Sequence, residues 1–87
     1  MKVALKSAES LLATLNPRDR ADIEARAAND IVAAAASTPS EIAALANAVA
    51  EKPWAYPVNR EVAILVAACL TVKASLMESG VAGAFAG

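Results

Sequence analysis

The chain has 87 residues, of which 24 are alanine and none is histidine, and its formal net charge is −1. This length fits one domain, and alanine supplies nearly half of the 57% hydrophobic content, which leaves a limited number of large apolar side chains for a core. The lack of histidine excludes Ser-His-Asp and Cys-His catalysis. The balanced charge disfavours nucleic acid or an anionic membrane as the main partner.

Residues 2–15 are predicted to form the first helix. Small and large apolar residues recur at spacings of three and four, at Ala4, Leu5, Ala8, Leu11, Leu12 and Leu15. Pro17 disfavours a helical conformation at Asn16 and fits the first position of a new helix. Asn16 is therefore the expected N-cap of the second helix.

The second helix is predicted over residues 17–36. Its inward face is expected to consist of Ile23, Ala27, Ile31, Ala34 and Ala35. Opposite charges lie four residues apart in three pairs, Arg20–Glu24, Asp22–Arg26 and Arg26–Asp30. Such pairs stabilise an exposed helix, so we interpret this face as solvated and self-neutralising, not as a functional charge patch.

A capping box begins the third predicted helix, which covers residues 39–52. Thr38 is the N-cap, Pro39 takes the first helical position and Glu41 the third. The inward face is expected to contain Ile42, Leu45, Ala46 and Val49.

The fourth helix is predicted over residues 59–79, with Asn59 as its cap. Every residue from Val62 to Leu70 is apolar, a run of nine that is much shorter than the ~20 residues a membrane span needs. A helix that is apolar on all sides is normally buried on all sides, so we expect it to be central. The expected helical domain covers residues 1–79, and a Gly/Ala-rich tail covers 80–87.

The reactive groups give no catalytic, metal or cofactor site. The single cysteine, Cys69, lies inside the apolar run, where a thiol is typically inert. Phosphate-binding glycine motifs are absent, and the densest carboxylate group, at Asp19, Asp22 and Glu24, alternates with arginines. We therefore expect a protein that is not an enzyme and has no cofactor. A lone cysteine cannot form an internal disulfide, so nothing points to an oxidising compartment and we expect the protein to be cytoplasmic.

A helix-turn-helix DNA-binding protein is the alternative. The second and third helices have its coarse layout, but the candidate recognition helix has no arginine or lysine before Lys52. Phosphate contacts dominate such binding and require basic groups. Nucleic acid is thus the less favoured partner.

The segment Pro53–Pro57 is the best candidate for a partner-binding surface. It holds Trp54 and Tyr56 between two prolines, and Lys52 and Arg60 flank it. Tryptophan and tyrosine are common at binding hot spots, and a proline-stiffened loop loses little entropy on binding. The competing interpretation, which the aromatic-poor composition favours, is that Trp54 plugs the end of the helical bundle.

The sequence as a whole predicts an all-α bundle of four helices with the fourth helix at its centre. The expected function is a small, non-enzymatic protein–protein interaction module, such as an adaptor, an assembly factor or a phage-type inhibitor of a host complex. Self-association as a homodimer through the first or fourth helix is part of this expectation, because so short a chain gains stability from additional buried area.

Overall fold

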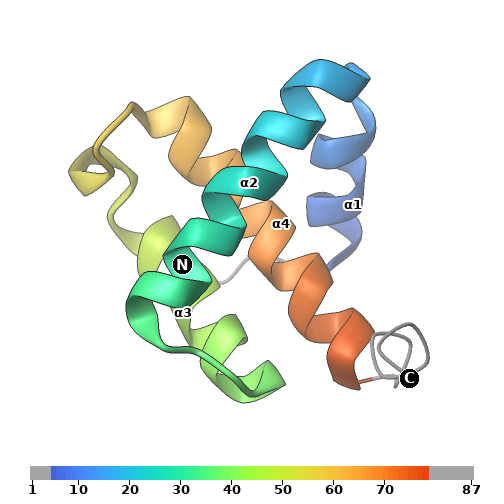
Figure 1. Cartoon of the computed structure of the whole chain (residues 1–87). Coiled ribbons are helices and arrows are strands. Elements are labelled where there is room, and N and C mark those ends of the chain that lie inside the picture. Colours follow the sequence, from blue (N-terminus) through green and yellow to red (C-terminus); the bar gives the residue numbers. More distant parts are fainter. Residues whose placement is uncertain (1–4, 79–87) are drawn as a thin grey trace.

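The computed structural model describes residues 5–78 of the chain, and in this part helices joined by short loops are the only regular secondary structure (Figure 1). The elements in order are α1 Leu5–Ala13, α2 Pro17–Ala34, α3 Pro39–Glu51, the short 3-10 helix η1 Pro53–Ala55 and α4 Arg60–Glu78. The predicted four-helix architecture is confirmed. The predicted start of the first helix at residue 2, the end of the fourth at 79 and the tail 80–87 lie outside the described residues.

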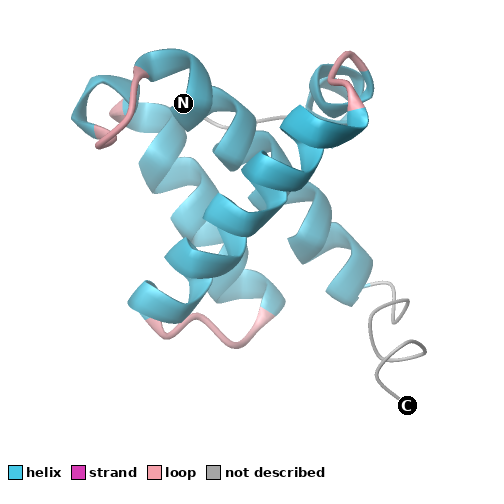
Figure 2. Ribbon diagram, turned by 45° about the horizontal axis from the view of Figure 1, so that its top comes forward, coloured by secondary structure: helices cyan, strands magenta, loops and turns pink. Residues whose placement is uncertain are grey.

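α4 is the central element, as its sequence predicts. It contacts α1, α2, α3 and η1, while α2 and α3 touch each other only slightly. In Figures 1 and 2, α2 crosses over α4, and α1 and α3 lie on different sides of α4. Within α4, Ala63 and every residue from Val66 to Leu70 are buried. The chain's own helices therefore cover the middle of α4, and no second subunit is needed to bury it.

The core is built largely from small side chains. Among the described residues, eight of the fourteen buried apolar residues are alanines. The largest side chains that are fully buried are Leu70 and Val66, both on α4. Alanine brings helix axes close together but contributes little transfer free energy, so the few large aliphatic side chains supply most of it.

Side chains cap three helix starts as predicted. The Oδ1 atom of Asn16 accepts a hydrogen bond from the Asp19 N–H at 2.8 Å, and the Oδ1 of Asn59 accepts one from the Val62 N–H at 2.8 Å. Thr38 Oγ1 accepts from the Glu41 N–H at 3.2 Å. These bonds satisfy backbone donors that have no partner inside a helix.

The Glu41 carboxylate completes the capping box in a modified way. It accepts hydrogen bonds from the Thr38 hydroxyl at 3.0 Å and, one residue further back, from the Ser37 hydroxyl at 3.3 Å and the Ser37 N–H at 3.5 Å. These bonds, led by the one from Thr38, favour the ionised carboxylate and lower the pKa of Glu41.

The end of α2 differs from its prediction. The helix stops at Ala34, two residues early, because Ala35 adopts a left-handed conformation with φ of 54°. The N–H groups of Ala36 and Ala35 then bond to the carbonyls of Ile31 and Val32, each at 3.1 Å. This is a Schellman motif formed without glycine. Ala34 and Ala35, predicted to face inward, are exposed, whereas Ala36, directly after the turn, packs against the core.

Among the described residues, no helix combines the length and apolar character that a membrane crossing requires.

Candidate functional site

The loop between α3 and α4 has a defined conformation. Its first part is the single turn η1, in which the Ala55 N–H donates to the Lys52 carbonyl at 3.0 Å and the Tyr56 N–H donates to the Pro53 carbonyl at 3.3 Å. Pro53 and Pro57 fix two of its backbone φ angles. The loop therefore presents its side chains from a backbone with few alternative shapes.

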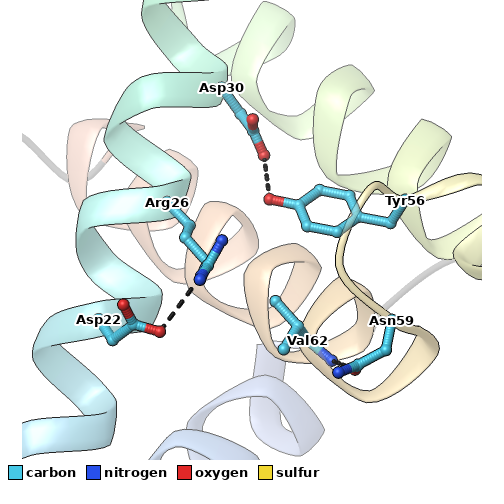
Figure 3. Close-up of polar contacts among 6 residues, drawn as sticks. All are labelled: Asp22, Arg26, Asp30, Tyr56, Asn59 and Val62. Carbon is cyan, nitrogen blue, oxygen red and sulfur yellow. Dashed lines mark hydrogen bonds and ion pairs between the residues drawn. The ribbon is translucent and has the colours of Figure 1, made fainter.

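Tyr56 anchors this loop to α2. Its hydroxyl donates a hydrogen bond to the Asp30 carboxylate at 2.8 Å, across 26 positions of sequence (Figure 3). The ring is half-buried and packs against the hydrophobic core. Burial and the bond to the Asp30 carboxylate, whose negative charge also disfavours the phenolate, raise the pKa of Tyr56 to about 12; nearby Arg26 opposes them.

The Tyr56 contact changes the predicted charge pattern of α2. Arg20–Glu24 and Asp22–Arg26 form as predicted, at 3.4 and 3.2 Å. The prediction of a third ion pair, Arg26–Asp30, was wrong. Arg26 Nε turns toward Asp22, and the Asp30 carboxylate turns toward the tyrosine hydroxyl (Figure 3).

Trp54 does not plug the bundle. Its side chain is 68% exposed, although it follows Pro53 directly and lies only two residues from the anchored tyrosine. Trp54 lies inside η1, whereas Tyr56 follows it with an extended backbone; Tyr56 packs against the core while Trp54 is exposed to solvent. The interpretation of Trp54 as a plug, which the composition favoured, is therefore wrong.

Two hollows lie on either side of Tyr56 and Pro57. The first, about 260 Å³, is lined by Ala48, Val49, Lys52, Ala55, Tyr56 and Pro57. The second, about 170 Å³, is lined by Arg26, Asn29, Asp30, Tyr56, Pro57 and Val58. The residues that line the first hollow are mainly apolar, and Lys52 is the one charged residue among them. The second hollow is lined by the polar side chains of α2.

The four predicted partner-binding residues are brought together in part. Lys52, Trp54 and Tyr56 share the loop, and Lys52 and Tyr56 line the same hollow. Arg60 is exposed at the first position of α4 and lines neither hollow. Within residues 5–78, neither Lys52 nor Arg60 forms an ion pair.

Sequence reasoning missed the contributions of other elements to this site. Asp30 was assigned to a solvated face, and Ala48 and Val49 were assigned only to α3. The local pattern carries no signal for these roles, because they depend on which turn of α2 and α3 meets the loop. The part of the site that lies in the loop, Pro53–Pro57, could be predicted from its prolines and aromatic residues alone.

Searches against protein-family models, curated proteins and solved structures find no match. The site must therefore be interpreted from its own geometry.

In the described part of the chain, no group of three or more potential metal ligands comes together. Cys69 is 4% exposed, as its place in the apolar run predicts, and lies below a hollow of about 120 Å³. Burial raises the pKa of the Cys69 thiol, with Lys73 opposing, so the reactive thiolate is disfavoured.

Proposed function

We propose that this protein is a small, non-enzymatic protein–protein interaction module whose partner-binding surface is the loop between α3 and α4. The loop surface consists of Lys52, Trp54, Tyr56 and the two hollows beside Tyr56. Arg60 lies next to it in sequence and would contact only the edge of a partner.

The observation that carries the proposal is the exposure of Trp54 on an anchored loop. An aromatic side chain that is 68% exposed buries a large area only when a partner covers it. The Tyr56–Asp30 bond and the prolines hold the loop in place before binding, which lowers the entropy cost of association. Aromatic residues on a preformed support are the usual centres of protein interfaces.

The exposed face of α3 gives no comparable support to DNA binding. Ser40, Glu41, Ala44 and Ala48 are all exposed, and none carries a positive charge. Phosphate contacts supply most of the affinity for DNA and need basic groups, so the exposed groups of α3 suit a protein partner better than DNA.

Affinity capture from the source cell, followed by mass spectrometry, tests the proposal. We expect Trp54→Ala to lose the specific partner while helicity and melting temperature stay nearly unchanged, because exposed side chains contribute little to folding. Leu5→Ala, which shortens another exposed apolar side chain outside the loop, is the matched control and should retain the partner. Equal capture by the wild type and the Trp54→Ala variant would contradict the proposal.

The proposal includes self-association, which the sequence predicted through the first or fourth helix. Because the chain's own helices cover the middle of α4, we propose the exposed face of α2 in its place. Ala21, Ala25, Ala28 and Val32 recur at spacings of four and three, and all are exposed, Val32 by 79%. The last turn of α2 has no basic residue, and Arg18 in its first turn forms no ion pair within residues 5–78. Two antiparallel α2 helices would therefore bring each Arg18 near the other helix's terminal carbonyls.

Light scattering over a range of concentrations tests this part separately. We expect a dimer for the wild type and a monomer for Val32→Asp, which places a charge on the apolar stripe. Val32→Ala keeps the stripe and should remain dimeric. A wild-type monomer at all concentrations would remove self-association but would leave the loop proposal intact.

A further inference from the structure

The size of the apolar hollow beside Tyr56 limits what it can hold. Its volume is about 260 Å³. It is a shallow depression that is widely open to solvent, and it is smaller than the roughly 300–1,000 Å³ of pockets for drug-sized molecules. The hollow therefore suits one large aliphatic or aromatic side chain better than a metabolite or cofactor.

The charges around Tyr56 indicate which charged group a partner would carry next to the apolar side chain that enters the hollow. In the polar hollow, Arg26 pairs with Asp22, and Asp30 accepts the tyrosine hydroxyl, so both charges have partners. In the apolar hollow, Lys52 is the one charged lining residue and forms no ion pair within residues 5–78. The charge still available at the loop surface is thus positive and lies at the edge of an apolar hollow.

We infer that the apolar hollow binds a large apolar side chain of a partner protein, from a short segment in which an aspartate or glutamate follows or precedes that side chain and pairs with Lys52. This inference rests on the proposed function and adds the chemistry of the partner. The apolar side chain supplies most of the affinity by filling the hollow, and the exposed Trp54 covers part of the same segment. The carboxylate contributes mainly selectivity, because ion pairs at an exposed edge are weak.

Selection from a display library of short random peptides tests the inference on the full chain and works with a partner of any identity. We expect the enriched peptides to share a large apolar residue with aspartate or glutamate beside it. Synthetic peptides of the enriched sequence then measure affinity. Lys52→Gln should weaken binding by about twofold to fivefold, and Lys52→Glu by about tenfold, because the attraction becomes a repulsion.

A second variant tests the hollow itself. Ala48 is exposed on α3 and lines the hollow, so Ala48→Phe should fill it and reduce peptide affinity more than tenfold without affecting the fold. Ala44→Phe is the matched control, because Ala44 is also exposed, lies one turn earlier and does not line the hollow. It should bind the peptide as the wild type does.

Three results would overturn the inference. The first is enrichment of no peptide above a Trp54→Ala background. The second is peptides that require Trp54 but bind equally well to Lys52→Glu and Ala48→Phe, which would place the binding elsewhere on the loop and leave the proposed function intact. The third is a wild-type dimer that Ala48→Phe dissociates, because the occupant would then be a second copy of this chain. The proposed function itself fails by a different result: the wild type and the Trp54→Ala variant capture the same partner equally well from cells.

Discussion

A hydrogen bond between Tyr56 and Asp30 anchors the loop surface to α2. The bond joins a phenol to a carboxylate at 2.8 Å, and the ring adds apolar contact with the core. Trp54, two residues earlier, has no such anchor and faces solvent. The two aromatic residues of the same short segment thus differ in their surroundings: Tyr56 fixes the loop to α2, and Trp54 is exposed, as the proposed contact with a partner requires.

The ionisation of Tyr56 should report this anchoring directly, because it is the one tyrosine of the chain. Its pKa rises from the ordinary 10.0 to about 12 in the folded protein, so folding favours the neutral phenol. The stability that this shift provides is complete below pH 10 and is lost as the pH rises from 10 to 12. We expect tyrosinate absorbance to appear at higher pH in the folded protein than in urea.

Asp30→Asn is the matched control for the tyrosine titration. It keeps an acceptor near the hydroxyl but removes the negative charge, so the midpoint should move down toward 10, while burial retains part of the shift. Tyr56→Phe should cost about 1 kcal/mol of unfolding free energy, the usual net value of one hydrogen bond. Identical titrations of the folded and unfolded wild type would disprove the anchor.

Cys69 provides a second measurement at the scale of a single side chain. Its side chain is 4% exposed and burial raises its pKa, so both access and thiolate content are low. We expect an aromatic disulfide reagent at pH 8 to label the folded protein much more slowly than the urea-unfolded chain. A folded-state rate equal to that of a free thiol would show that α4 is less covered than the structure indicates.

At the scale of one element, the end of α2 carries an avoidable cost. Ala35 has a left-handed backbone, a conformation that costs residues with a Cβ about 1–2 kcal/mol and glycine almost nothing. Because both Schellman hydrogen bonds use backbone groups, Ala35→Gly keeps them. We expect this variant to raise the unfolding free energy by about 1 kcal/mol in urea denaturation.

The neighbouring residue supplies the control for this prediction. Ala34 is also an exposed alanine, but it is the last residue of α2 and has helical geometry. Ala34→Gly should therefore destabilise the protein, by roughly 0.5–1 kcal/mol. If both glycine variants lowered stability equally, the left-handed conformation at residue 35 would be wrong.

The same two residues show how far the sequence could predict the elements. Helix starts were predictable because Asn16, Thr38 and Asn59 act locally, through backbone groups within three residues. The end of α2 was not, because alanine carries no stop signal and the turn is made by backbone geometry. In the candidate site, the loop and its aromatics were visible in sequence, whereas the choice of Asp30 as the partner of Tyr56 depends on tertiary packing.

At the scale of the whole molecule, α4 makes the fold depend on one helix. α1, α2, α3 and η1 all contact α4, while their contacts with one another are few. No pair of outer helices could form a core alone, so the described part of the chain should unfold as one cooperative unit. The loop surface depends on the same unit, because its anchor is on α2 and its apolar hollow is on α3.

Leu70→Ala tests this dependence on α4. Leu70 is fully buried and is one of the two largest fully buried side chains in the described core. Its truncation should cost about 2–5 kcal/mol, a large part of the 5–15 kcal/mol typical of folded domains. We expect helicity, Cys69 protection and the raised Tyr56 titration to be lost together in one urea transition at lower concentration. Leu76→Ala, at a side chain that is 43% exposed, should shift the transition much less. Separate transitions for the three probes would show that the outer helices are stable without α4.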